Sequence, residues 1–123
     1  SLSQTLSDHE IHLVANGGII GWLQKKGRMN KAWKPRYTAF YCGHLYYFDG
    51  PLTVMRGDIP LDDIVDVHEY HEKNPPTSRG SPSAGGAAFA VVTRQRREFY
   101  FYAESKYAAE HWVKVLSAAV QRR

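Results

Sequence analysis

One densely basic stretch of the chain limits how it can fold. Residues 21–36 contain no acid, and their basic members are Lys25, Lys26, Arg28, Lys31, Lys34 and Arg36. No Asp or Glu occurs anywhere in residues 17–48, so the net charge of +4 conceals an uneven distribution. Cations crowded between two expected strands repel one another, whereas a concave site with little water strengthens their attraction to an anion. The stretch therefore predicts either an anion-binding site or a solvated basic hairpin.

The composition is that of one ordinary globular domain. With 123 residues, of which 43% are hydrophobic and 23% charged, the chain is long enough to bury a core without disulfides. Its single cysteine, Cys42, excludes an internal disulfide and favours a reducing, cytoplasmic setting. We expect no signal peptide, and no apolar run approaches the roughly 18 residues that span a bilayer. Membrane contact is therefore expected to be peripheral.

The alternation of apolar and polar residues predicts short strands followed by one helix. The expected strands are 18–26, 34–42, 44–48, 56–61, 64–68, 88–93 and 98–103. A helix capped by Ser105 is expected to end near Val120, with Trp112 on its apolar stripe. The predicted fold is mostly β with one helix, namely a seven-stranded antiparallel barrel or orthogonal sandwich capped by a C-terminal α-helix.

The alternation in the first two expected strands aims several cations at one place. Successive residues of a strand point to opposite faces, so Lys25 lies on the same face as Leu23. In the second strand, Lys34 and Arg36 share a face with Phe40. If Leu23 and Phe40 point into the core, the three cations converge on one mouth of the barrel, where an inward cation needs a partner. This convergence favours a binding site over a solvated hairpin.

Two segments stand apart from this pattern. Residues 1–17 are expected to form an N-terminal flank ahead of a domain at 18–123. Ser7 and Glu10 have the spacing of a capping box, so the flank is read either as a short helix or as a disordered leader. Residues 70–87, rich in Pro, Gly and Ser, are expected to be a flexible insertion, because strand signals resume after them.

Several short motifs occur in a fixed order along the chain. Gly21-Trp22-Leu23 opens the first expected strand, Trp33-Lys34-x-Arg36-Tyr37 opens the second, Leu45-Tyr46-Tyr47-Phe48 forms the third, Gly57-x-Ile59-Pro60-Leu61 forms the fourth, and Trp112 with Leu116 lies on the helix. This ordered set resembles the pleckstrin homology (PH) domain family over roughly residues 18–120. The resemblance implies a non-catalytic module that binds phosphoinositide headgroups and recruits its parent protein reversibly from the cytoplasm to the plasma membrane.

The resemblance extends to the PH domains that bind 3-phosphorylated inositides. Those members carry a lysine at the end of the first strand and a K/R-x-R pattern at the start of the second, which Lys25, Lys34 and Arg36 match. They also carry a tyrosine in the third strand and an arginine just before the fourth, which Tyr47 and Arg56 match. The implied ligand is PtdIns(3,4,5)P3 or PtdIns(3,4)P2 in an anionic membrane surface.

The resemblance implies a role for each matching residue. Arg36 and Arg56 would contact the 3-phosphate, and Lys25 would bridge the 3- and 4-phosphates. Tyr47 would hydrogen-bond the 4-phosphate. The implied headgroup site comprises Lys25, Arg28, Lys31, Lys34, Arg36, Tyr47 and Arg56, with Lys34 adding charge at the rim and the two loop cations Arg28 and Lys31 meeting a 5-phosphate. No cofactor, metal or catalytic residue is implied.

Two features depart from the family pattern. Thr38 stands where the family usually has a large apolar residue, which leaves the local packing open. Some members recruit ligand contacts from a long insertion between the sixth and seventh strands, but here that connection is the short turn 93–98. Any contribution from it would come from Arg94, Arg96 or Arg97. The preference between bis- and tris-phosphates therefore stays open.

Three other functions compete with this interpretation. The main alternative is a protein–protein interaction module of PH/PTB type, with a peptide along a sheet edge or helix groove. Single-stranded nucleic acid is disfavoured, since no motif accompanies the aromatic residues and these are expected to serve the core. An enzyme or a metal site is disfavoured too, because His68 and His71 with Glu69 and Glu72 match no zinc spacing. We expect no catalysis, no metal and no nucleic acid.

Overall fold

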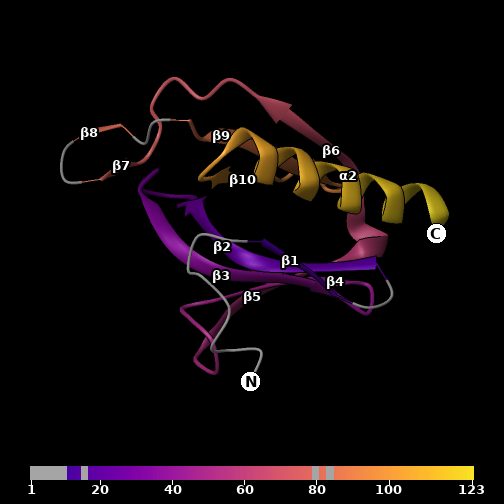
Figure 1. The fold of residues 1–123 in the computed structure, drawn as a ribbon. Coiled ribbons are helices and arrows are strands. Elements are labelled where there is room, and N and C mark those ends of the chain that lie inside the picture. The colour runs from indigo at the N-terminus through magenta and orange to yellow at the C-terminus, as the bar shows by residue number, and fades with distance from the viewer. Residues whose placement is uncertain (1–10, 15–16, 79–80, 83–84) are drawn as a thin grey trace.

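The computed structural model describes residues 11–14, 17–78, 81–82 and 85–123 (Figure 1). In these residues an eight-stranded antiparallel sheet, a two-stranded hairpin and one long helix are formed. The strands are β1 (Ile11–Val14), β2 (Gly18–Lys26), β3 (Trp33–Tyr41), β4 (His44–Phe48), β5 (Met55–Pro60), β6 (Ile64–Tyr70), β7 (Thr77–Ser78), β8 (Ser81–Pro82), β9 (Ala87–Thr93) and β10 (Glu98–Ala103), and a 3₁₀ turn, η2 (Leu61–Asp63), precedes β6. The helix α2 (Lys106–Arg122) follows β10. The predicted fold class is confirmed.

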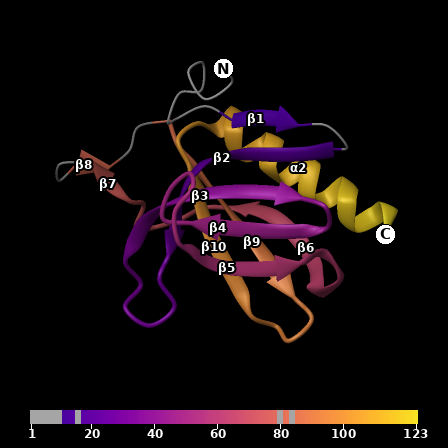
Figure 2. The same ribbon diagram turned by 90° about the horizontal axis from the view of Figure 1, so that it is seen from below.

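The sheet folds over on itself at β2. Its strand order is β5-β4-β3-β2-β10-β9-β6, so β2 joins the layer of β3, β4 and β5 to the layer of β10, β9 and β6. Only the end of β2 reaches β10, through Gln24 and Lys25 opposite Tyr102 and Phe101. Figure 2 shows the strands of one layer crossing those of the other, and α2 runs along the side of β6, β9 and β10. This corner brings the end of β2 beside the start of β10.

The described part of the N-terminal flank is a strand and not a helix. β1 runs antiparallel to the first half of β2, from Ile11 opposite Gly21 to Val14 opposite Gly18. That half of β2 is not paired with β10, so β1 supplies partners for backbone groups at a free sheet edge. A capping-box spacing cannot reveal such a partner. Ser7 and Glu10 themselves lie outside the described residues.

The insertion predicted over 70–87 begins as a tethered segment. The Glu72 carboxylate accepts hydrogen bonds from the Tyr70 hydroxyl at 2.6 Å and from the Asn74 backbone N–H at 3.0 Å. Lys26 Nζ lies 3.2 Å from the same carboxylate, and the indole N–H of Trp33 donates to the Asn74 carbonyl at 2.9 Å. The first residues of the insertion are thereby fixed to the end of β2 and the start of β3. Residues 79–80 and 83–84 lie outside the description.

The core forms where the inward faces of both layers meet the helix. Trp112 of α2 is fully buried, and its ring stacks on Phe89 with centroids 6.3 Å apart. Thr38 is also fully buried and donates to the Arg36 carbonyl at 3.1 Å, with Tyr47 directly opposite on β4. Thr38 is the residue for which the resemblance implied a larger apolar side chain, and Tyr47 lies directly across from it. The helix plug predicted from the sequence is confirmed.

We expect Trp112→Ala to destabilise the fold by about 3–5 kcal/mol, because it leaves a large cavity in the core. Trp112→Phe should cost clearly less, since the buried indole N–H has no hydrogen-bond partner in the described residues. Urea unfolding followed by circular dichroism measures both values. Equal losses for the two variants would contradict this expectation and would indicate a polar partner for the indole.

Candidate functional site

The site is the mouth of the barrel, where the ends of β2 and β4 lie beside the starts of β3, β5 and β10. We define the mouth by the residues that face it: Lys25, Arg36, Tyr47, Asp49, Arg56, Arg97 and Phe99. The β2–β3 loop lies beside it, and Gly27, Arg28 and Lys31 share a cleft of about 60 Å³ with Lys25 and Arg97. The β2–β3 and β9–β10 connections project from the same side of the molecule (Figure 2).

Lys25 points into this mouth, as the strand alternation predicts. Its Nζ lies 4.8 Å from the centroid of the Tyr47 ring and 5.5 Å from that of Phe99. The pKa of Lys25 is lowered from 10.5 to about 8. Burial is the largest cause, and the positive charges of Arg97 and Arg36 contribute the rest. The ammonium is therefore partly dehydrated and surrounded by like charges. An anion bound here would relieve both costs.

Arg36 and Arg56 converge on one carboxylate. Arg56 Nε and Nη2 donate to Asp49 Oδ1 and Oδ2 at 2.8 and 2.9 Å, which is the bidentate geometry of a strong ion pair. Arg36 Nη1 lies 3.3 Å from Asp49 Oδ1 and also donates to the Pro35 carbonyl at 2.9 Å. The hydrogen bonds from Arg56 hold the pKa of Asp49 below its usual value, and the charges of Arg36 and Lys34 act in the same direction.

A β-bulge positions Arg56. Tyr47 pairs with Gly57, but the next residue, Phe48, pairs with Met55, so Arg56 is the extra residue in β5. Gly57 is required here, since a Cβ at this position would lie 2.1 Å from the Tyr47 ring. The bulge and the glycine together let Tyr47 lie flat under Lys25 while Arg56 turns toward Asp49.

The β2–β3 loop is closed by its own backbone. The Gly27 N–H donates to the Ala32 carbonyl at 2.6 Å, and the Ala32 N–H donates to Asn30 Oδ1 at 3.1 Å. A Cβ on Gly27 would lie 2.4 Å from that amide oxygen, so a larger residue here would displace the Asn30 side chain. Arg28 and Lys31 are exposed on this turn. Their placement beside Lys25 agrees with the loop position expected for them.

Lys34 lies at the rim that the resemblance implied for it, whereas sequence reasoning assigned Arg97 little weight and Asp49 none. Lys34 lies opposite Lys25 in the strand register, but its side chain is exposed at the rim. Arg97 was named only as one of three candidates in its turn, yet its guanidinium stacks 4.2 Å from the Phe99 ring centroid and lines the cleft with Lys25. Asp49 was missed, because the sequence search was for cations. Its signal was its position as the first acid after the acid-free stretch, directly following β4.

The opposite face of the β2 end is closed by the protein itself. Lys26 Nζ lies over the rings of Trp33 and Tyr100, at 5.5 and 5.6 Å, and pairs with Glu72, whose side chain is only 6% exposed. Lys26 is therefore a structural cation with its own acid. Lys26 thus has an acidic partner, whereas the charges that act most on Lys25 are those of Arg97 and Arg36.

The aromatic residues considered for nucleic acid were Trp33, Tyr37, Tyr46 and Phe48, and they are half-buried rather than core residues. Trp33 packs edge to face on the buried Tyr102, with centroids 5.9 Å apart, and the others have aromatic neighbours on the outer face of the sheet. Trp22 and Tyr37 meet edge to face with centroids 5.4 Å apart, and Tyr46 lies between His44 and Phe48 at 5.5 and 6.2 Å. Their rings are half-buried by these contacts.

The described residues form neither a metal site nor a membrane-spanning helix. His68 pairs with Asp66 at 2.7 Å, and within the described ranges no cluster of His, Cys, Asp and Glu is arranged to hold a metal ion. No helix in the described part of the chain is both long and apolar enough to cross a bilayer.

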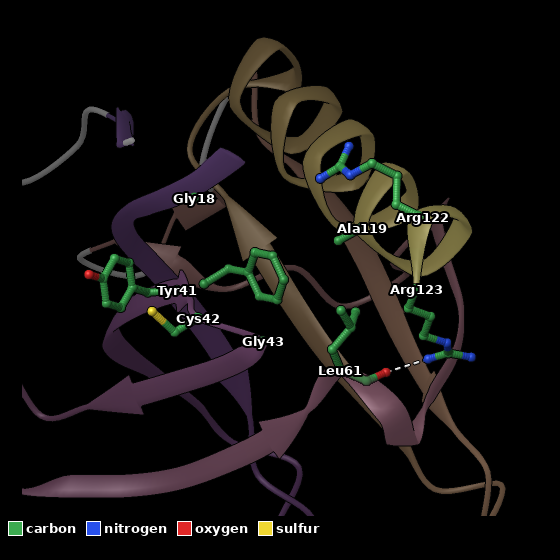
Figure 3. A pocket seen from close by; sticks show the side chains of 9 residues that line it. Gly18, Tyr41, Cys42, Gly43, Leu61, Ala119, Arg122 and Arg123 are labelled. Atoms are coloured by element: carbon green, nitrogen blue, oxygen red, sulfur yellow. Dashed lines mark hydrogen bonds between the residues drawn. The ribbon is translucent and has the colours of Figure 1, made fainter. Parts of the chain in front are cut away.

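A larger pocket of about 240 Å³ opens at the other end of the barrel (Figure 3). Phe40, Leu61 and Ala119 provide apolar surface there, and the side chains of Arg122 and Arg123 point in different directions. Arg123 is already bound to the carbonyls of Leu61 and Ile64. The two cations therefore do not converge as those of the mouth do, so the smaller cleft is the better candidate site for a multiply charged anion.

Comparison with known proteins places these features in a wider group. A family model for the PH domain matches residues 18–121 of this chain. Mouse "Pleckstrin homology domain-containing family A member 2" is 30% identical over an alignment of 106 residues that covers 82% of this chain. The chain spans 23% of the length of that relative.

Solved structures share the fold at low sequence identity. The C-terminal PH domain of pleckstrin in complex with D-myo-Ins(1,2,3,5,6)P5 has a TM-score of 0.66 and 20% identity, over 82% of this chain and 92% of that one. The N-terminal PH domain of human ARAP2 has a TM-score of 0.63 and 22% identity, over 90% of this chain and 85% of that one. These likenesses establish the fold.

We expect Arg97→Ala to raise the pKa of Lys25 above its value of about 8, because the variant removes one of the two like charges that depress it. A ¹³C NMR titration of the lysine Cε resonances gives the midpoint. Arg96→Ala, an exposed cation of the same turn, is the matched control and should leave the midpoint unchanged. An equal effect of both variants, or of neither, would contradict the proximity of Arg97 to Lys25.

The same pKa has a consequence for stability. The unfolded chain keeps the Lys25 proton to about pH 10.5, whereas the folded protein releases it near pH 8. Between these values the unfolded state binds more protons, so the contribution of this group to the free energy of unfolding rises with pH. Arg97→Ala should flatten that rise in urea unfolding measured across the same window.

Proposed function

This chain belongs to the PH domain family, and we propose that it is a non-catalytic module that binds phosphoinositide headgroups at the mouth of its barrel. The observation that carries the proposal is Lys25, which is held inward, partly dehydrated and beside Arg36 and Arg97. A phosphate group carries nearly two negative charges and several acceptor oxygens, and guanidinium groups bind it bidentately. The complex of the pleckstrin domain with an inositol pentakisphosphate supports this ligand class.

The mouth offers cations on two sides of one space. Lys25 and Arg97 line one side together with the loop residues Arg28 and Lys31, and Arg36 and Arg56 form the other side around Asp49. We propose that the headgroup lies between the two sides, with its ring phosphates distributed over both. By resemblance, Arg36 and Arg56 would receive the 3-phosphate, which makes PtdIns(3,4,5)P3 or PtdIns(3,4)P2 the proposed lipid.

Such binding would recruit the parent protein reversibly from the cytoplasm to the plasma membrane. Exposed cations near an anionic leaflet each add on the order of 1 kcal/mol to membrane attraction. Lys31, Lys34 and Arg28 are exposed around the mouth and would contribute in this way. The alternative of a protein-interaction module would leave these cations without a common ligand.

Liposome sedimentation with Arg36→Ala tests the proposal. The wild type should bind vesicles containing about 2–5% PtdIns(3,4,5)P3 in phosphatidylcholine, and the variant should lose this binding, because a charged hydrogen bond to phosphate contributes about 1.5–3 kcal/mol. Lys114→Ala, an exposed cation on α2, removes the same charge away from the mouth and should bind as the wild type does. Equal binding by all three proteins would favour the protein-interaction alternative.

We expect headgroup affinity to fall as the pH rises above 8. A bound phosphate stabilises the protonated form of Lys25, so the complex retains a proton that the free protein releases near pH 8. Phosphate itself is fully ionised by then, since its second pKa is about 6. Calorimetry at pH 8 in buffers of different ionisation enthalpy should show proton uptake on binding. Binding heat independent of the buffer would contradict a role for Lys25.

A further inference from the structure

Asp49 occupies the position in which a bound phosphate would be expected. We propose that this carboxylate is an internal competitor of the ligand, which lowers affinity for a phosphate between Arg36 and Arg56 and so determines which phosphate positions the mouth accepts. This inference rests on the proposed function, because it assigns the specificity of the same site. The argument depends on three features: the hydrogen-bond donors that Asp49 uses, the uneven charge of the mouth, and the independence of the loop from the Asp49 side chain.

Asp49 takes up the donors that a phosphate would need. Arg56 presents two N–H groups in parallel to its carboxylate, at 2.8 and 2.9 Å, and Arg36 Nη1 approaches the same group at 3.3 Å. The guanidinium fork matches carboxylate and phosphate equally well in shape. Arg36 has a further hydrogen bond to the Pro35 carbonyl, so its Nη1 is shared between two acceptors. A phosphate can use these donors fully only after the carboxylate has moved away.

The other side of the mouth differs, because no carboxylate is among the charges that act most on Lys25, although Glu98 lines the cleft with it. The pKa of Lys25 is depressed by its burial and by the charges of Arg97 and Arg36, and the charges that act on it most are both positive. The negative charge of Asp49 thus offsets the charges of Arg36 and Arg56, and the side of Lys25 and Arg97 keeps a positive excess. A phosphate that binds beside Lys25 gains attraction at once, whereas one beside Arg56 meets a like charge.

The loop does not need the Asp49 carboxylate to hold its shape. The backbone N–H of Asp49 donates to the Val54 carbonyl at 3.0 Å, and Thr53 bonds to the Gly50 carbonyl through both its N–H and its hydroxyl. The Asp49 side chain is 35% exposed, so it can turn toward solvent. Asp49→Asn therefore removes the charge while the β4–β5 connection keeps its backbone hydrogen bonds.

The opposite role would be that Asp49 holds Arg36 and Arg56 ready for the ligand. The two roles differ in sign, because a competitor weakens binding and a positioning residue strengthens it. Calorimetry with Ins(1,3,4,5)P4 and Ins(1,4,5)P3, which differ by the 3-phosphate, separates them. Asp66→Asn is the matched control, since it removes an acid that is likewise paired, with His68, on β6.

We expect Asp49→Asn to bind Ins(1,3,4,5)P4 about tenfold more tightly than the wild type, the size of one charge-assisted hydrogen bond. Its gain for Ins(1,4,5)P3 should be no larger than that of Asp66→Asn with either ligand. Unchanged or weaker binding of Ins(1,3,4,5)P4 would overturn the proposal, and weaker binding would identify Asp49 as a positioning residue. Equal gains for both ligands would also overturn it, because they would show a general effect of net charge.

A second measurement does not depend on any headgroup. Pyrophosphate should raise the melting temperature of Asp49→Asn more than that of the wild type or of Asp66→Asn. If it does so while neither inositol phosphate binds, the proposed function fails and Asp49 is still a competitor for phosphate. If pyrophosphate stabilises all three proteins equally, the role proposed for Asp49 is wrong, whatever the headgroup results are.

A measurement on the wild type covers the case in which the Asn variant does not fold. Hydrogen bonds from Arg56 hold the pKa of Asp49 low, so a phosphate that takes Arg56 from it should raise that pKa. An NMR titration of the Asp49 carboxyl carbon, with and without saturating pyrophosphate, detects the change. An Asp49 pKa that stays the same or falls when pyrophosphate is bound would overturn the proposal.

Discussion

The placement of one ammonium group, that of Lys25, determines what the rest of the mouth can do. The same strand alternation that buries Leu23 turns Lys25 inward, and the rings of Tyr47 and Phe99 support it there. Burial costs a cation free energy, and Arg97 adds repulsion to that cost. The folded protein therefore stores an unfavourable interaction that an anionic ligand removes. Selective binding of the proposed ligand would follow from this stored interaction more than from the total number of basic residues.

The two faces of β2 treat neighbouring lysines in opposite ways. Lys26 is provided with Glu72 from the tethered start of the insertion, whereas Lys25 is left without a partner of opposite charge among the groups that act on its pKa most. The insertion thus does more than join two strands, because it neutralises the face that is not used for the ligand. An anion approaching the end of β2 consequently meets a positive excess on one side only.

Most of the fold, and the inward side of the mouth, could be predicted from period-2 alternation and from the ordered motifs around Trp22, Tyr47 and Trp112. These signals are local, since each depends on spacing within one element. The rest depends on tertiary register. Arg56 is placed by a bulge against β4, and Lys26 pairs with Glu72, which lies 46 residues further along the chain. Asp49 follows β4 directly, so in the sequence it looks like a residue that only ends a strand. The pairing of β1 was missed because a four-residue strand has no pattern that distinguishes it from a helix start.

The strand β1 has a practical consequence for fragment design. The family match begins at residue 18, and a fragment cut there would lack the strand that pairs with residues 18–21 of β2. Their outward backbone groups would then form an open sheet edge, which favours association between molecules. Dimers seen with such a shortened protein would reflect the missing strand, and membrane avidity measured with them would overstate the affinity of a single domain.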